Sequence, residues 1–297
     1  MNMETTKNNS ESSPYLQGET DRTTYYGYTC IGGRTEDQDY MDHEEIHGNE
    51  IFLVCDGMGG HAGGCVASET AAQTLLEAFR SQTEVLPAEE AVIMAVKAAN
   101  DAVYKKSQDE VSLRGMGTTL TLLLIDGHAA YVTHVGDSRI YQLRQGQKVF
   151  RTFDHSLVFE HVARDMSFFQ RLRNIFHHDD KEYLTEEEAR VHPRANVLSK
   201  AIGILPEVEV EVIKLEYKTG DRFVLCCDGV WNTQPEPEII SMFTAHTDLE
   251  ATVKATQSLV EKIGKEKGGQ HDNHTMVAID MKCDSEYRVT ALHRLFS

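Results

Sequence analysis

Short apolar runs that end in an acid and glycines are the main pattern of the chain. Ile51–Val54 leads into Asp56 and five glycines between residues 57 and 64, and Arg222–Cys227 leads into Asp228 and Gly229. Apolar runs of this length, bounded by glycines, are typical of buried strands. The sequence therefore predicts two buried strands that each end in a carboxylate beside flexible backbone.

Helices and further strands are predicted between these two runs. Cys65–Arg80 is rich in helix formers, and Ala88–Ser107 places its valines on one helical face. Strand-like segments then follow at Thr118–Ile125, Ala130–Val135, Ser138–Leu143 and Gln147–Thr152, with a hairpin expected at Gly127. Four successive strands after two helices indicate an α+β protein with antiparallel, helix-covered sheets, because βαβ units would alternate strands with helices along the chain.

The flanking segments complete this prediction. Residues 1–22 are polar and predicted to be disordered, and 154–193 is an irregular excursion that contains a capping-box helix start at Thr185–Glu188. The remaining predictions are strands at Thr24–Ile31, Glu207–Leu215 and Thr275–Ile279, and helices at Glu236–Ala245 and Glu250–Gly264.

Composition narrows the class of protein. The formal net charge of −18 over 297 residues argues against a nucleic-acid or anionic-membrane partner. The six cysteines show no C-x-x-C spacing, which argues against a disulfide framework or a zinc site and favours the cytoplasm. No stretch approaches the roughly 18 apolar residues of a membrane-spanning helix, and the N-terminus lacks the apolar segment of a signal peptide.

Acids recur at predicted strand ends, and together they suggest a site. They are Asp39, Asp56, Asp228 and Asp272, with Asp137 as a fifth. Oxygen-only ligands suit Mg²⁺ and Mn²⁺. Two such ions about 3.5–4 Å apart can share a carboxylate and a water, lower the pKa of that water, and support displacement at phosphorus. The pattern predicts a phosphate-ester hydrolase.

A dinucleotide-binding loop is the main alternative for the glycine-rich segment. Residues 57–62 satisfy the G-x-G-x-x-G/A pattern, and a helix is predicted to follow. Asp56, however, would stand where a pyrophosphate must approach, and no second strand ending in an acid follows about 20 residues later. The sequence therefore disfavours this alternative.

Ordered motifs give the chain a family resemblance over about residues 23–282. They are DGMGGHAGG (56–64), GMGTTL (115–120), HVGDSRIY (134–141), FDHSLV (153–158), HPRANVLSKAIG (192–203), GDRFVLCCDGVWN (220–232) and HDNHTMVAI (271–279). The chain resembles the type 2C metal-dependent Ser/Thr protein phosphatases (the PPM family), most of all the bacterial-style branch. The resemblance implies a four-layer α-β-β-α sandwich with a binuclear metal centre at one end. It also implies a catalytic domain at 23–282 with a flap at about 158–192, and a C-terminal tail at 283–297.

The resemblance implies roles for individual residues. Asp56 would bridge two Mn²⁺ or Mg²⁺ ions, with Asp39 and the Gly57 carbonyl on the second ion and Asp228 and Asp272 on the first. Three further candidates belong to the same site: Arg34 to bind phosphate, Asp137 to hold a weaker third ion, and His61 to protonate the leaving oxygen. For His61, a loop-packing or solvent-facing role is the favoured alternative because its spacing from Asp56 differs from that of the eukaryotic catalytic histidine.

The chain departs from the family pattern at three places. Asp37 replaces the usual Asn before Asp39, so Asp37 and Asp39 remain alternatives as ligand. His271 lengthens the gap between the paired glycines and Asp272, and Asn232 replaces an Asp.

The expected function is a phosphoprotein phosphatase in which a metal-bridging hydroxide attacks phosphoserine or phosphothreonine directly. Expected partners are Ser/Thr-phosphorylated proteins, plausibly targets of a cognate kinase, and the protein is expected to be a cytoplasmic monomer. A cysteine phosphatase is disfavoured, since no Cys has an Arg six positions later. A non-catalytic domain of the same fold should lack the metal acids, which are present.

The flap is longer than the resemblance implies. Its extra segment, about Ser167–Lys181, combines basic residues with three phenylalanines in an acidic chain. Two interpretations stay open: the segment packs on the sandwich, or it binds acidic or phosphorylated protein segments.

Overall fold

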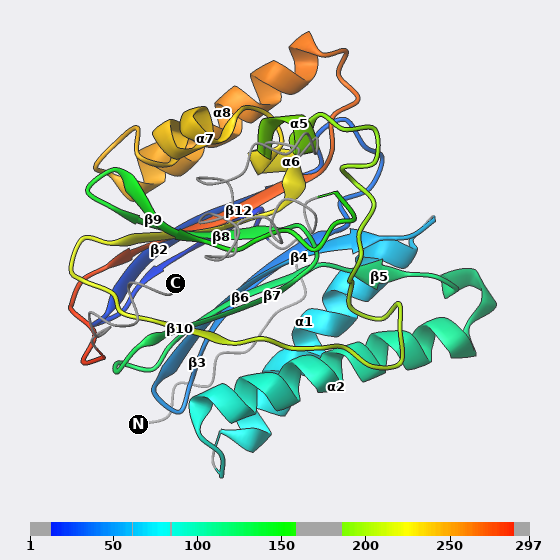
Figure 1. Ribbon diagram of the computed structural model, residues 1–297, viewed down its shortest axis with the longest axis horizontal. Coiled ribbons are helices and arrows are strands. Elements are labelled where there is room, and N and C mark those ends of the chain that lie inside the picture. Colours follow the sequence, from blue (N-terminus) through cyan, green and yellow to red (C-terminus); the bar gives the residue numbers. More distant parts are fainter. Residues whose placement is uncertain (1–12, 61, 84, 159–185, 288–297) are drawn as a thin grey trace, which may run out of the picture.

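The fold has four layers, helices–sheet–sheet–helices (Figure 1). The structure is a computed structural model that describes residues 13–60, 62–83, 85–158 and 186–287. Both sheets are antiparallel throughout. The predicted α+β sandwich with antiparallel central sheets is therefore confirmed. The extra segment of the flap lies outside the described residues.

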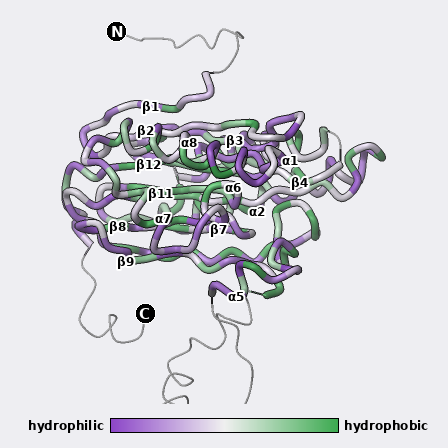
Figure 2. The backbone as a smooth tube through the Cα atoms, turned by 90° about the horizontal axis from the view of Figure 1, so that it is seen from above, coloured by the Kyte–Doolittle hydropathy of each residue, from purple (hydrophilic) through white to green (hydrophobic). Residues whose placement is uncertain are grey.

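One sheet, here the β2 sheet, runs in the order β1-β2-β12-β11-β8-β9. Figure 2 shows these strands in that order from one edge to the other. Their bounds are β1 Tyr15–Glu19, β2 Thr23–Cys30, β8 Arg139–Arg144, β9 Gln147–Arg151, β11 Arg222–Cys226 and β12 His274–Met281.

The second sheet, here the β4 sheet, runs in the order β10-β7-β6-β4-β3, and the short β5 pairs with the end of β4. Its strands are β3 Asp39–Ile46, β4 Asn49–Met58, β5 Gly117–Thr118, β6 Leu120–Ile125, β7 Ala130–Val135 and β10 Ile213–Leu215. The expected hairpin joins β6 and β7, whose register pairs Ile125 with Ala130.

Helices cover both outer faces of the sandwich (Figure 1). Helices α1 (Gly63–Gln82) and α2 (Ala88–Asp109) lie on the β4 sheet, and α7 (Glu236–Phe243) and α8 (Leu249–Glu266) lie on the β2 sheet. Shorter helical segments are η1 Val111–Leu113, α5 Glu186–Arg190 and α6 Asp228–Trp231. No helix within the described ranges is both long and apolar enough to cross a membrane.

The central strands are buried on both faces, which explains why their sequences are continuously apolar. In β4, Phe52 and Val54 join the core between the two sheets, whereas Leu53 packs with the residues of α1 and α2. In β11, Phe223 faces the other sheet and Val224 packs with α7 and α8. Successive side chains of a strand point to opposite faces, so a strand between two apolar layers needs apolar residues at every position.

The structure corrects two expectations. Tyr15–Glu19 forms β1 and pairs with β2, so the prediction of disorder for residues 1–22 is wrong for this part. Of the strand predicted at Glu207–Leu215, only β10 at Ile213–Leu215 is a strand. The structure packs Val208, Val210 and Val212 against the core under α1 and α2 but does not place them in a strand ladder. Alternation of apolar and polar residues indicates that one face is buried, but it does not show that a neighbouring strand pairs with the segment.

Candidate metal centre

The five acids singled out in the sequence meet at one end of the sandwich. Asp39 begins β3 and lies opposite Asp56 of β4 in the strand register. Asp137 lies in the β7–β8 turn, Asp228 begins α6 directly after β11, and Asp272 precedes β12. A cavity of about 1020 Å³ is lined by all of these acids except Asp39, together with Arg34, Gly57 and Thr119.

Backbone hydrogen bonds fix the position of Asp56. Its N–H donates to Oγ1 of Thr119 at 2.9 Å, and its carbonyl accepts from the Thr119 N–H at 2.8 Å and from Oγ1 of Thr118 at 3.0 Å. Thr118 and Thr119 belong to the GMGTTL motif. The motif therefore anchors the central acid of the cavity, a role that the sequence alone did not assign to it.

Close backbone approach requires glycine at two positions beside the acids. A Cβ on Gly57 would lie 2.1 Å from the carbonyl oxygen of Gly64, and one on Gly229 would lie 1.9 Å from that of Asn273. No real Cβ tolerates such distances, so each glycine lets two backbone segments approach each other. The glycine after each acid is thus part of the construction of the site.

Burial and mutual repulsion strongly perturb the acids. Burial, with the nearby Asp37 and Asp228 carboxyls, raises the pKa of Asp39 to about 8. Burial and the Asp272 carboxyl raise the pKa of Asp228 to about 6. The pKa values of Asp56 and Asp137 lie well above the usual range for the same reasons. Four carboxyls therefore share a buried region that disfavours their charged forms.

The two carboxylate oxygens of Asp39 differ in their hydrogen-bond partners. Its Oδ2 accepts a hydrogen bond from the Cys227 thiol at 3.3 Å, while Oδ1 is buried and has no hydrogen-bond partner among the described residues. Buried polar atoms in native proteins are nearly always paired, so this carboxylate oxygen beside other acids is suited to binding a cation. The Cys227 thiol also lies beside Asp39 and Asp56, but burial raises its pKa, so the other donors, all oxygen atoms, define the site and suit a hard divalent ion such as Mn²⁺ or Mg²⁺.

The structure favours Asp39 over Asp37 as a ligand. Asp37 accepts hydrogen bonds from Oγ1 of Thr29 at 2.7 Å and from the Asp39 N–H at 3.2 Å, so its carboxylate organises the loop. Asp39 is the residue that lies opposite Asp56.

Arg34 reaches the same cavity from its rim. Its Nη2 donates to Oδ2 of Asp272 at 2.7 Å, and both side chains are about half exposed. A guanidinium carries five N–H donors, so one can hold Asp272 while others face the cavity. Arg34 therefore lies beside the acids, as predicted. The other candidate, His61, lies outside the described residues.

Two residues that the sequence analysis did not assign also shape the site. The Asn273 side chain accepts from the Gln38 N–H at 3.1 Å and donates to the carbonyls of Ile31 and Glu36, which ties the Arg34 loop to the start of β12. Lys200 lines the cavity. The sequence could have drawn attention to Asn273, because it directly follows the candidate ligand Asp272. It could not show which loop the Asn273 side chain binds.

His155 and three buried cysteines lie in surroundings that disfavour a catalytic role. His155 stacks on His134, accepts from the Gly136 N–H at 3.3 Å, and burial lowers its pKa to about 3, which favours a structural role. Cys55, Cys226 and Cys227 are fully buried, and burial raises the pKa of each thiol. A thiolate nucleophile is therefore disfavoured at these positions.

Comparisons with known proteins agree with this geometry. Residues 26–264 match the family model of protein phosphatase 2C. The serine/threonine phosphatase stp of Listeria monocytogenes serotype 4b is 33% identical over 238 residues, which are 77% of this chain and 84% of that protein. The PPM Ser-Thr phosphatase MsPP of Mycobacterium smegmatis, solved with cacodylate, has a TM-score of 0.69 at 28% identity over 86% of this chain and 97% of that chain.

A second similar structure contains metal. The catalytic domain of the serine threonine protein phosphatase PstP in complex with two manganese ions has a TM-score of 0.64 at 25% identity, over 88% of this chain and 99% of that chain. The chain belongs to the protein phosphatase 2C family. It is accordingly a protein-serine/threonine phosphatase of a metal-dependent family, and the predicted resemblance is confirmed.

Proposed function

We propose that the acids at the end of the sandwich hold two divalent ions and that the protein hydrolyses phosphoserine and phosphothreonine directly, without a phospho-enzyme. The observation that carries this proposal is the convergence of carboxyls around Asp56, one of which, the buried Asp39, has an oxygen without a hydrogen-bond partner among the described residues. When bound there, the ions would supply an activated water and positive charge for the phosphoryl oxygens.

The chain's own residues have distinct tasks in this proposal. Asp56, which the other acids surround, would be the shared ligand, while Asp39 and the Gly57 carbonyl would help to hold one ion and Asp228 and Asp272 the other. Burial and like-charge repulsion raise the pKa values of Asp39, Asp56 and Asp228, and a bound cation would offset both by stabilising the ionised carboxylates.

Arg34 is the proposed phosphate ligand. It lies on the rim of the cavity, where its half-exposed guanidinium can reach a phosphoprotein substrate. The planar fork of the guanidinium suits bidentate binding of phosphate oxygens, and its bond to Asp272 fixes its orientation. Substrate binding and the metal ligands are thereby linked through one ion pair.

The ions are Mn²⁺ or Mg²⁺ in this proposal, and Asp137 with Asp228 would hold a weaker third one. Support for two ions comes from the similar PstP domain, which was solved with two manganese ions. The six cysteines are all free, which supports a cytoplasmic location. A monomer, a cognate kinase and a catalytic His61 remain predictions.

Calorimetric titration of the metal-free protein with Mn²⁺ tests the proposal. We expect two tightly bound ions per chain, and a loss of tight binding in Asp56→Asn with the fold retained. Glu250→Gln is a matched control, because Glu250 is an exposed carboxylate on α8 that pairs only with its helix neighbour Lys254 in the described contacts. Unchanged stoichiometry in Asp56→Asn would contradict the assignment of Asp56.

A further inference from the structure

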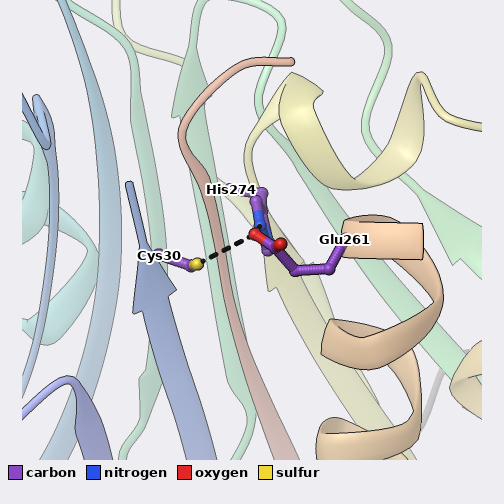
Figure 3. Close-up of side chains that lie close together, drawn as sticks. All are labelled: Cys30, Glu261 and His274. Atoms are coloured by element: carbon purple, nitrogen blue, oxygen red, sulfur yellow. Dashed lines mark hydrogen bonds and ion pairs between the residues drawn. The ribbon is translucent and has the colours of Figure 1, made fainter. Parts of the chain in front are cut away.

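A second group of potential metal ligands lies outside the acid site. Cys30 at the end of β2, Glu261 of α8 and His274 at the start of β12 point toward one another (Figure 3). One ligand atom from each lies within 4.8 Å of the other two. The residues come from three elements that are far apart in the sequence, so C-x-x-C spacing could not reveal them.

The distances within this cluster resemble those around a tetrahedral ion. Oε1 of Glu261 lies 3.3 Å from Sγ of Cys30 and 3.1 Å from Nε2 of His274. With usual zinc bond lengths, tetrahedral ligand atoms are separated by about 3.3–3.6 Å. These two separations lie within a few tenths of an ångström of the tetrahedral values.

Outer contacts already orient two of the ligands. The Tyr28 hydroxyl lies 3.0 Å from Nδ1 of His274, which leaves Nε2 to face the cluster. Lys265 binds Oε2 of Glu261 at 2.8 Å, which leaves Oε1 to face it. Metal-binding histidines and carboxylates are commonly held by second partners of this kind.

We propose that Cys30, Glu261 and His274 bind a zinc ion. A thiolate and an imidazole favour zinc over Mg²⁺ and Mn²⁺, which prefer oxygen ligands. This site would thus differ in metal from the carboxylate-rich acid site. His274 is fully buried, while Cys30 and Glu261 are partly exposed, so the cluster is both ordered and open to entry.

A bound zinc ion would also constrain the segment that carries Asp272. His274 follows Asp272 by two positions, and His271 precedes it with Nε2 at 3.3 Å from Oε1 of Glu261. Nδ1 of His271 is buried and has no hydrogen-bond partner in the described part of the chain. Zinc at Glu261 and His274 would hold the end of this segment against α8, and would stabilise the position of Asp272 in the acid site.

The same side chains also form a network that needs no metal. In that network Glu261 accepts hydrogen bonds from the Cys30 thiol and from His274, at the same distances of 3.3 Å and 3.1 Å. The two cases differ in one measurable property, a bond between the Cys30 thiolate and a metal.

The absorption spectrum of the full chain with added Co²⁺, in excess Mg²⁺, distinguishes the zinc site from the metal-free network. We expect one equivalent of Co²⁺ to produce a thiolate-to-cobalt charge-transfer band, because cobalt replaces zinc in sites with thiolate ligands. Cys227 needs a control, since its thiol lies beside Asp39 and Asp56. The band should persist in Cys227→Ala and vanish in Cys30→Ser. Absence of the band in the parent protein, or its persistence in Cys30→Ser, would overturn the proposal.

Zinc affinity and thermal melting give independent measurements. Glu261→Gln, which retains the shape of the side chain, should bind zinc at least about tenfold more weakly in competition with a chromophoric chelator. Zinc should raise the melting temperature of the parent and of Cys227→Ala more than that of Cys30→Ser, because only the first two bind it at this cluster in the native state. Equal zinc affinity and equal melting shifts in all of these proteins would contradict the site.

Discussion

Asp39 and Asp56 lie directly opposite each other in the β3–β4 ladder. Directly opposed residues of antiparallel strands have Cβ atoms about 4.5–5.5 Å apart, and like charges in such pairs are destabilising. Asp39 is buried and Asp56 is half-buried, and Asp228 adds a third carboxyl at the start of α6. A cation between them converts this repulsion into attraction, so the ladder register is the structural basis of the proposed site.

Replacement of Arg34 should weaken substrate binding more than the chemical step. We expect Arg34→Ala to raise KM for a phosphopeptide about tenfold, which corresponds to roughly 1.4 kcal/mol, because charge-assisted contacts to phosphate are lost. Arg34→Lys should recover part of the loss, since it restores the charge without the bidentate fork. Steady-state kinetics measure both constants. A large fall in kcat with an unchanged KM would show that Arg34 does not act as a phosphate ligand.

Asp137 should affect a weaker ion and leave the two tight ones in place. Its backbone is held by the Trp231 indole, whose Nε1–H donates to the Asp137 carbonyl at 2.9 Å, so Asp137→Ala should keep the local fold. We expect the dependence of turnover on Mn²⁺ concentration to change while calorimetry still detects two tight sites. Loss of a tight site in Asp137→Ala would assign this carboxylate to the primary pair.

The close approach at Gly57 should make alanine costly there. Gly57→Ala would place a Cβ 2.1 Å from the Gly64 carbonyl oxygen, whereas a Cβ on Gly60 meets nothing within 4 Å. We expect Gly57→Ala to reduce the free energy of unfolding by about 1–3 kcal/mol and to weaken Mn²⁺ binding, since the backbone must shift. Gly60→Ala is the matched control in the same loop. Equal denaturant stability of the two variants would contradict the packing argument.

The metal-free protein should lose stability between about pH 6.5 and 8. The pKa of Asp39 is raised to about 8, so in this range the native state holds a proton that the unfolded chain has released, and stability falls as pH rises. Thermal melting in EDTA measures this slope, and Asp39→Asn should flatten it. Mn²⁺ should bind more tightly at pH 8 than at pH 6.5, because protons compete less. A slope unchanged by Asp39→Asn would show that another group titrates.

The sequence predicted the local parts of this structure and missed the relations between distant parts. Asp56 and Asp228 could be identified because each follows a continuously apolar strand and precedes a glycine. The opposition of Asp39 to Asp56 depends on register, which the local pattern around Asp39 does not contain. The valines at 208–212 alternate as in a strand and pack through one face, but no strand among the described residues pairs with them.

The cluster of Cys30, Glu261 and His274 illustrates the same limit. The cysteine count and spacing argued against zinc, because spacing rules detect ligands that are close in sequence. Here β2, β12 and α8 bring the three residues together only after the sheet and its covering helix have formed.

Phosphate release from a phosphothreonine peptide by the metal-stripped protein tests the central claim most directly. We expect no release in EDTA, recovery on addition of Mn²⁺, and a loss of at least about 100-fold in turnover for Asp56→Asn at saturating Mn²⁺, since removal of a metal's charge costs several kcal/mol in the transition state. Glu250→Gln should match the parent throughout. Full activity of the parent after exhaustive EDTA treatment, or parent-like turnover of Asp56→Asn, would contradict a mechanism that depends on ions held by these acids.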